Sequence, residues 1–233
     1  MLTAPFGFLR LAAAAPKVTV GDPEANVSEM LRTVAEAKSR GAQVIVFPEL
    51  GLTGYTVGDL FLSLETLVGG AERALGRLLA ETASHPMVVA VGMPVHAEDK
   101  LFNCAVLVQS GRVLGVVPKT YLPGYREFYE ERWFSSVREA RGDSVRLLGT
   151  RVPFGTDLVF ALEDEPGVCL AAEICEDLWM PVPPSSLHAL AGATVILGLA
   201  ASDELVMKAE YRRELLKVQS GGGLCAYAYA NAG

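Results

Sequence analysis

Three residues able to do amide chemistry each come directly after an apolar, β-prone run of the sequence. Glu49 and Lys119 each follow such a run and a proline, which ends a strand because it cannot donate to the sheet, and Cys175 follows a third run. In α/β proteins functional residues gather just beyond the carboxyl ends of strands, so we expect the three to meet. The carboxylate would accept the thiol proton, and the ammonium, with the backbone N–H after the cysteine, would stabilise an oxyanion. The set predicts cleavage of amides or nitriles through a thioester.

Other catalytic arrangements find less support in the residues. The histidines that would usually activate a thiol are His85, His96 and His188, and none of them follows a strand-like run. The sequence contains no Gly-x-Ser-x-Gly nucleophile elbow. The glycine-rich stretch Ser220–Gly223 lacks the Gly-Lys-Ser/Thr of a phosphate loop, so nucleotide binding has no motif here.

The cysteines argue against both disulfides and a metal site. Cys104, Cys169 and Cys225 lie within strand-like runs, where a cysteine is usually a small buried apolar residue. In an extended run Cys169 and Cys175 would lie about 20 Å apart, far beyond the reach of a disulfide. There is no Cys-x-x-Cys pair, so zinc is unsupported and we expect no metal. This pattern favours a cytoplasmic protein.

Composition excludes several classes of protein. The chain has 233 residues, is 51% hydrophobic and 20% charged, and carries a net charge of −7, values typical of a globular domain and not of a disordered one. An acidic chain without a basic cluster does not favour nucleic-acid binding. No apolar run approaches the ~20 residues that span a membrane. The apolar start, Met1–Ala15, lacks the basic beginning of a signal peptide, and we interpret it as leading into a first buried strand.

Strand and helix signals alternate along the chain. Asp22 offers a helix N-cap with Pro23 at the first helical position, and Gly41 closes that helix. Ser110-Gly111 predicts a two-residue hairpin turn. Such alternation predicts an α/β sandwich, a mixed sheet covered by helices, within one domain. The expected strands are 9–14, 44–47, 87–91, 104–109, 112–117, 168–174, 194–199 and 224–230. One helix is expected after Asp22, and a second contains Leu75, Leu78, Leu79 and Thr82 and ends before Pro86. A final helix carries Met207, Tyr211 and Leu215 on one face.

The order Glu49, Lys119, Cys175 resembles the Glu-Lys-Cys triad of the nitrilase, or carbon–nitrogen hydrolase, superfamily over nearly the whole chain. Two longer motifs, Phe47–Phe61 and Lys119–Glu130, are similar to the amino-terminal glutaminase domain of the glutamine-dependent NAD synthetase branch. The resemblance implies a four-layer α-β-β-α sandwich in which residues 1–233 form a shortened glutaminase domain lacking its C-terminal elements.

The resemblance also implies roles for the three residues. Cys175 would attack the side-chain amide of glutamine, and Glu49 would act as the general base. Lys119, together with the backbone N–H of Glu176, would hold the oxyanion. Glu127, eight residues after Lys119, corresponds to the second glutamate near the triad of the superfamily.

Substrate-binding residues follow from the same resemblance. Tyr125, Glu176 and Ser202 fall where the family contacts glutamine, and Lys208 keeps the charge of a basic residue found at its position. Two positions depart from the family pattern, because Gly198 and Ala200 stand where Asn and Ser are common. Met207 stands where the family usually has Gly, and Gly58 stands where the family often has an acidic residue. These departures put glutamine specificity in more doubt than amide cleavage.

The resemblance implies partners as well. The synthetase domain is absent from this chain, so ATP, Mg and deamido-NAD would bind elsewhere, and this domain would need no cofactor. Its ammonia would pass to a synthetase domain or subunit, and the chain would assemble as a homo-oligomer. Two alternatives stay open: a separate amidase, nitrilase or carbamoylase with another substrate, and an inactive, shortened module that serves binding or assembly.

Overall fold

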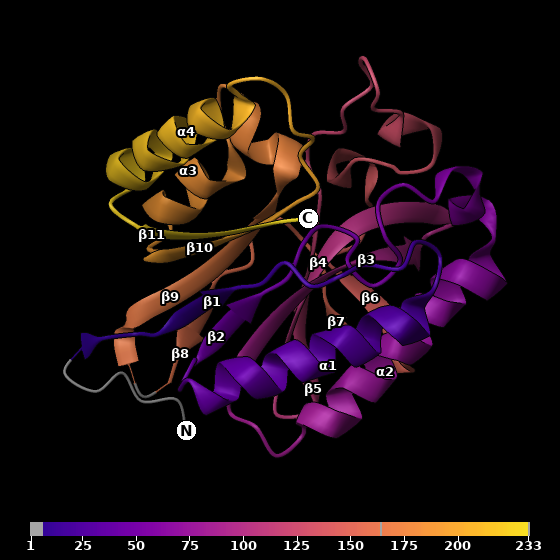
Figure 1. The fold of residues 1–233 in the computed structure, drawn as a ribbon, viewed down its shortest axis with the longest axis horizontal. Coiled ribbons are helices and arrows are strands. Elements are labelled where there is room, and N and C mark those ends of the chain that lie inside the picture. The colour runs from indigo at the N-terminus through magenta and orange to yellow at the C-terminus, as the bar shows by residue number, and fades with distance from the viewer. Residues whose placement is uncertain (1–6, 164, 233) are drawn as a thin grey trace.

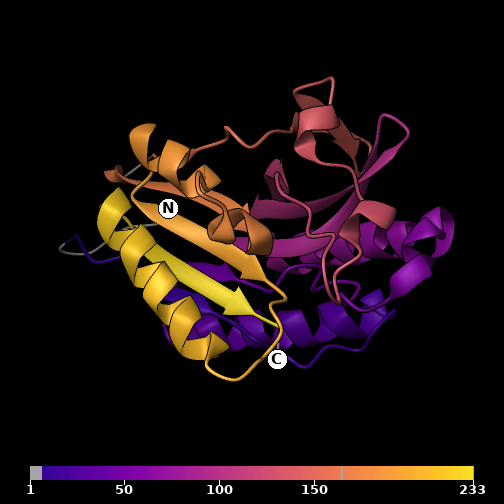
Figure 2. The same cartoon turned by 90° about the horizontal axis from the view of Figure 1, so that it is seen from above.

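The computed structural model describes residues 7–163 and 165–232. Two β-sheets lie face to face, and helices cover the outer face of each sheet (Figures 1 and 2). The inner faces of both sheets contribute to one apolar core, in which Val46 and Leu107 of the first sheet join Ala172 and Leu197 of the second. This architecture confirms the predicted four-layer α-β-β-α sandwich.

The first sheet has five strands in the order β1-β2-β3-β4-β5. Strands β1, β2 and β3 are parallel, whereas β4 is antiparallel to both β3 and β5. Because of this order, β2, β3 and β5 all end at the edge of the sheet where β4 begins. The bounds are β1 Leu11–Ala13, β2 Val44–Val46, β3 Val88–Ala97, β4 Lys100–Gln109 and β5 Arg112–Pro118.

Helices α1 (Pro23–Ser39) and α2 (Gly69–Thr82) cover this sheet (Figure 1). The predicted cap is present, since the side chain of Asp22 accepts a hydrogen bond from the backbone N–H of Ala25 at 3.0 Å. Helix α2 ends at Thr82, before Pro86, and a turn fills the interval, in which the N–H of His85 bonds to the carbonyl of Thr82.

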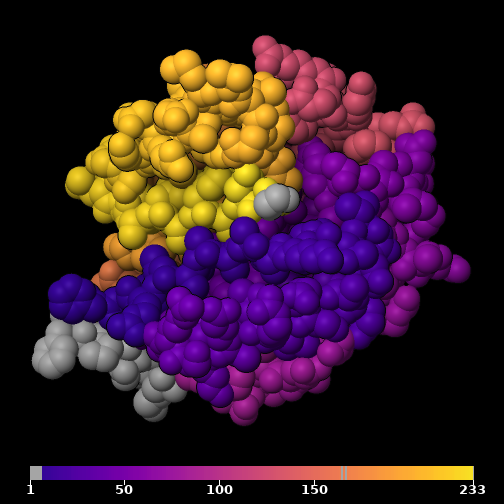
Figure 3. Space-filling model, in the orientation of Figure 1, coloured from indigo at the N-terminus to yellow at the C-terminus, as the bar shows by residue number. Residues whose placement is uncertain are grey.

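The second sheet has four strands in the order β11-β10-β9-β8. Strands β9, β10 and β11 are parallel, and β8 is antiparallel to β9. Helices α3 and α4 cover its outer face, and in the space-filling view this half of the chain packs directly against the first half (Figure 3). The bounds are β8 Phe160–Leu162, β9 Glu165–Ile174, β10 Val195–Ala200, β11 Ala226–Asn231, α3 Pro184–Leu190 and α4 Lys208–Gly223.

The remaining elements are short. The predicted turn at Ser110-Gly111 is confirmed: it joins β4 to β5 with positive φ angles of 48° and 74°. A separate hairpin and several single turns complete the chain: β6 Ser144–Leu147 with β7 Thr150–Pro153, the 3₁₀ turns Gly58–Leu62, Glu130–Arg132, Val137–Glu139 and Cys175–Trp179, and the π turn Leu64–Val68.

Helix α4 differs from its prediction. It begins at Lys208, and Met207 precedes it as an N-cap in the left-handed conformation, with φ at 66°. Met207 and Tyr211 are exposed, and Arg212 is the residue of α4 that is buried. Met207 therefore lies just outside the helix, and Tyr211 is not on a face that packs in the core. Instead, Tyr211 stacks on Trp179, with ring centroids 5.6 Å apart.

All four cysteines are free thiols, as expected. In the part of the chain that the structure describes, no helix is both long and apolar enough to cross a membrane.

Candidate active site

The structure brings Glu49, Lys119 and Cys175 together at the strand ends. Lys119 and Cys175 directly follow β5 and β9, and Glu49 lies just beyond β2. The Nζ of Lys119 donates to Oε1 of Glu49 at 2.6 Å, and both side chains are fully buried. Cys175 is 8% exposed, lines a cavity, and interacts electrostatically with both partners. The spatial arrangement expected from the sequence is therefore present.

The turn that carries Cys175 is strained and well anchored. Cys175 has a φ of 45°, a left-handed conformation that costs a non-glycine residue about 1–3 kcal/mol. Asp177 anchors this turn from within. Its Oδ1 accepts from the backbone N–H groups of Thr120 at 3.1 Å and Tyr121 at 2.9 Å, and its Oδ2 accepts from that of Ile174 at 3.1 Å. This single carboxyl therefore ties the cysteine turn to the segment after Lys119.

The second glutamate at the triad is Glu130, and the assignment of this place to Glu127 is wrong. Glu130 is 1% exposed, and its Oε1 accepts from Lys119 Nζ at 2.6 Å and from the hydroxyl of Tyr55 at 2.7 Å. Glu127 is exposed at the cavity mouth. The chain loops outward after Pro123, so that Glu127 is exposed. It returns at Glu130, whose N–H bonds to the carbonyl of Pro123 at 3.2 Å. A spacing of eight residues from Lys119 therefore ends at the cavity mouth, and one of eleven ends in the buried cluster.

Glu49 has donors on both of its oxygens. Asn103 donates to Oε1 at 2.7 Å, the oxygen that also accepts from Lys119, and the backbone N–H of Ala201 donates to Oε2 at 3.0 Å. The same N–H of Ala201 also interacts with the sulfur of Cys175. The segment after β10 therefore connects the carboxylate to the thiol.

Burial determines the protonation states of the site. Burial, and after it Glu49, raises the pKa of the Cys175 thiol well above its usual value, although Lys119 opposes this. Burial alone would lower the pKa of Lys119, but the carboxylates of Glu130 and Glu49 hold that pKa well above its usual value. The resting site thus contains a protonated thiol beside an ammonium, and the thiol needs a base before it can attack.

Two cavities open onto this cluster. One, of about 530 Å³, is lined by Cys175 and Trp179, and the other, of about 730 Å³, is lined by Glu49. They share Phe128 and Ser202 in their walls. A small molecule in the first cavity can therefore contact the sulfur, and the second gives an approach to the carboxylate.

The predicted substrate-binding residues all lie around the first cavity. The hydroxyl of Tyr125 donates to the carboxylate of Glu176 at 3.1 Å. The Nζ of Lys208 lies 5.4 Å from the ring centre of Trp179, and Lys208 also pairs with Asp203. The cavity therefore presents an ammonium and a carboxylate on different parts of its wall.

Ser202 is held by two residues, Arg212 and Asn231, that sequence patterns did not mark as functional. Its hydroxyl accepts from Nη1 of Arg212 at 3.1 Å. Its backbone N–H donates to Oδ1 of Asn231 at 2.8 Å, and the Nδ2 of Asn231 donates back to its carbonyl at 3.0 Å. Ser202 is consequently fixed at the wall shared by the cavities.

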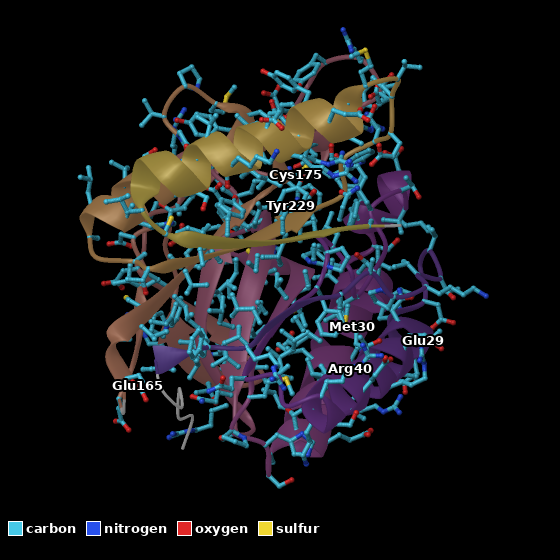
Figure 4. The ribbon with its side chains drawn as sticks, turned by 60° about the vertical axis from the view of Figure 1, so that its left-hand side comes forward. Glu29, Met30, Arg40, Glu165, Cys175 and Tyr229 are labelled. Atoms are coloured by element: carbon cyan, nitrogen blue, oxygen red, sulfur yellow. The ribbon has the colours of Figure 1, made fainter. Side chains whose placement is uncertain are left out.

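The departure at Gly198 has a packing reason. A Cβ at this position would lie 2.6 Å from Cε1 of Tyr227 and 2.9 Å from Cδ2 of Tyr229. The two tyrosine rings of β11 therefore occupy the space that a side chain would need. Tyr229 lies close to Cys175 beneath α4 (Figure 4), and its buried hydroxyl has no hydrogen-bond partner among the described residues.

Within residues 7–163 and 165–232 no group of three or more His, Cys, Asp or Glu side chains is placed to hold a metal ion.

Comparison with known proteins defines the class. A family model described as carbon-nitrogen hydrolase matches residues 10–232. The chain therefore belongs to the carbon–nitrogen hydrolase family.

The similar proteins are larger. The glutamine-dependent NAD(+) synthetase of Mycobacterium tuberculosis is 45% identical over 227 residues, which is 97% of this chain and 33% of that protein. The protein of the same name from Aquifex aeolicus is 32% identical over 96% of this chain and 35% of its own length. This chain spans about a third of the length of these curated relatives.

Solved structures agree on the fold. A glutamine-dependent NAD(+) synthetase from Cytophaga hutchinsonii superposes with a TM-score of 0.81 at 30% identity, over 96% of this chain and 36% of that one. An amidase from Nesterenkonia sp. superposes with a TM-score of 0.76 at 20% identity, over 96% of this chain and 76% of that one.

Proposed function

We propose that this chain hydrolyses the side-chain amide of glutamine to glutamate and ammonia through a thioester on Cys175. The observation that carries the proposal is the buried ion pair between Lys119 and Glu49, with a 2.6 Å contact, next to a thiol that lines a cavity. Its similarity to glutamine-dependent NAD(+) synthetases supports glutamine as the substrate.

In the first half of the reaction, Glu49 takes the proton of the Cys175 thiol while the sulfur bonds to the amide carbon. The amide oxygen becomes an oxyanion, which Lys119 and the backbone N–H of Glu176 stabilise. When the tetrahedral intermediate collapses, the carbon–nitrogen bond breaks and Glu49 returns the proton to the departing nitrogen as ammonia forms.

In the second half, Glu49 takes a proton from a water molecule that attacks the thioester carbon. The carbon–sulfur bond breaks, glutamate leaves, and the sulfur regains its proton. The second cavity, which is lined by Glu49, offers that water a route to the base. Lys119 retains its proton throughout, because its ammonium also pairs with Glu130 while Glu49 carries the transferred proton.

The mouth of the first cavity suits a zwitterionic amino acid. Lys208 would attract the α-carboxylate of glutamine, while Glu176 and the exposed Glu127 would attract its α-ammonium group. Tyr125 orients Glu176 by its hydrogen bond, and Ser202 offers a hydroxyl at the same wall. Recognition of the amino acid would therefore depend on charges at the mouth of the cavity, away from the reacting amide.

A partner completes the proposal. We propose that the ammonia passes to a synthetase domain or subunit, which would itself bind ATP, Mg and deamido-NAD. We also propose that copies of the chain pair through the exposed apolar side chains of α3 and α4, which include Leu190 at 86% and Val218 at 69% exposure. A cytoplasmic location stays a prediction.

A covalent-capture experiment tests the proposed reaction. Purified chain would be incubated with glutamine, with ammonia measured, and separately with a diazoketone analogue of glutamine, followed by peptide mapping. We expect ammonia release and a label on Cys175 that is lost in Cys175→Ala. Labelling at Cys104, Cys169 or Cys225 instead, or ammonia release unaffected in Cys175→Ala, would overturn the assignment.

One feature favours an alternative to glutamine as the substrate. Gly198 and Ala200 lack the polar side chains common at those positions of the family, which points to another small amide or nitrile as an alternative. A panel of ω-amides and nitriles separates the two possibilities. Turnover of a different compound with none of glutamine would favour the alternative, and no turnover of any compound would favour the inactive module.

A further inference from the structure

Asn103 contacts all three charged residues of the buried cluster. Its Nδ2 donates to Oε1 of Glu49 at 2.7 Å and to Oε2 of Glu130 at 3.3 Å. Its backbone carbonyl accepts the N–H of Lys119 at 2.8 Å. Asn103 is fully buried in β4, and it belongs to neither cavity wall, so it is not placed to touch a substrate.

We infer that Asn103 is a positioning residue which makes Oε2 of Glu49 the proton-accepting oxygen. The inference rests on the proposed hydrolysis. Oε1 of Glu49 already accepts from Asn103 and from Lys119, so both of its lone-pair directions are used. Among residues 7–163 and 165–232, Oε2 accepts one hydrogen bond, from Ala201, whose N–H also interacts with the sulfur of Cys175. The oxygen with a free lone pair is thus the one on the cysteine side.

An amide is suited to this place because it donates two hydrogen bonds without changing the charge. Two carboxylates already share one ammonium here, since Lys119 lies 2.6 Å from both Glu49 and Glu130. Another carboxylate would add repulsion in a buried site, and another cation would compete with Lys119 for the two carboxylates.

The other end of the amide shows what orients it. The Oδ1 of Asn103 is buried without a hydrogen-bond partner among the described residues, an arrangement that is unfavourable for a polar atom. Asn26 provides a contrast, because it is equally well buried, its Oδ1 accepts from Thr19, and its Nδ2 donates to the carbonyls of Thr19 and Leu52. A purely structural asparagine uses both ends, whereas Asn103 leaves one unused in order to face the two carboxylates.

Loss of the Asn103 donor should change the pH dependence of the base. A carboxylate that loses a donor holds its proton more tightly, so the acid limb of the pH profile should move to higher pH. The titratable or charged groups that interact with Glu49 are Tyr55, Lys119, Glu130, Cys175, Glu176 and Tyr229, and none of them is altered by the substitution.

The experiment compares Asn103→Leu and Asn103→Ala with the unaltered chain, Glu49→Gln and Asn26→Ala. The rate of alkylation of Cys175 by iodoacetamide is followed from pH 4 to 9 by peptide mass spectrometry, and glutamine hydrolysis is followed over the same range. For the Asn103 variants we expect the acid limb to rise by about one pH unit, with kcat about tenfold lower and KM within about twofold. Asn26→Ala should lower the melting temperature and leave the pH profile in place.

The outcomes separate the two proposals. If the unaltered chain and Glu49→Gln give the same alkylation profile, Glu49 is not the base and the proposed function fails. If those two differ while a folded Asn103 variant keeps the profile of the unaltered chain, the role of Asn103 is overturned. Two variants are used because the alanine substitution leaves a cavity and the leucine substitution fills it, and either one, once folded by circular dichroism, decides the result.

Discussion

The floor and the rim of the candidate site are built in different ways. The floor, defined as Glu49, Asn103, Lys119 and Glu130, has side chains exposed by 1% or less and joined by short hydrogen bonds. The rim, defined as Tyr125, Glu127, Lys208 and Tyr211, lines the cavity mouth. Tyr125 is 52% exposed and Tyr211 is 62% exposed.

This difference separates the chemistry from the choice of substrate. On the floor, removing one partner leaves a buried charge uncompensated, so each residue depends on the others. On the rim, solvent screens the charges and a lost contact is partly replaced by water. Substitutions on the rim should therefore change which amide binds, while substitutions on the floor should stop the reaction.

The largest effect is expected from Lys119→Met. This change leaves two carboxylates buried together, so we expect a loss of about 3–5 kcal/mol in the free energy of unfolding and a fall in kcat on the order of 10²–10³. Chemical denaturation and steady-state assays measure the two quantities. The matched control is Lys100→Met, which removes a lysine paired with Glu139 at the surface. Equal effects of the two substitutions on the free energy of unfolding and on kcat would contradict the claim that the floor residues depend on one another.

An intermediate effect is expected from Glu130→Gln. Burial raises the pKa of Glu130 from 4.5 to about 7, with Lys119 opposing this and Glu49 adding to it. Between these two pH values the folded chain keeps a proton that the unfolded chain releases, so the free energy of unfolding should fall as the pH rises. Glutamine cannot ionise, so this part of the pH dependence should disappear.

Denaturation curves between pH 4 and 8 measure this change, and we also expect about a tenfold fall in kcat from the weaker hold on Lys119. Glu131→Gln, at an exposed neighbouring position, is the control and should retain the slope of the unaltered chain. A slope that persists in Glu130→Gln would show that another group carries the pH dependence.

The smallest effect is expected from Lys208→Met on the rim. The ammonium should attract a carboxylate in the substrate, so its loss should raise KM about tenfold and leave kcat within about twofold. Lys217→Met on the same helix should change neither, because Lys217 is exposed and pairs with Glu214. A large fall in kcat for Lys208→Met would remove the distinction between rim and floor.

Much of the site could be predicted because its parts follow strands in the sequence. Glu49, Lys119 and Cys175 each end a strand, and that position is visible as an apolar run followed by a reactive residue. Asn103 was missed because it lies inside a strand. Strand β4 is antiparallel to its neighbours, so its beginning, and not its end, lies at the edge of the site.

Glu130 and α4 show a second limit of sequence patterns. The position of Glu130 depends on how far the loop after Pro123 extends before the chain turns back, and spacing alone does not contain that length. The spacing of Met207, Tyr211 and Leu215 predicted that they share one face of a helix, but Met207 precedes α4 in a left-handed conformation, and the buried residue of α4 is Arg212.

The sequence by itself determined the alternation of strands and helices and the three reactive residues that follow strands, because these depend on local patterns of apolar and polar residues. Its longer motifs implied the four-layer fold by resemblance. Only the tertiary structure decided which donors each oxygen of Glu49 accepts from, which second glutamate contacts Lys119, and where the rim lies. Those features arise from hydrogen bonds between segments distant in the chain, such as the 54 positions that separate Glu49 from Asn103. No local pattern records such bonds, since their lengths and directions exist only after the two sheets have packed.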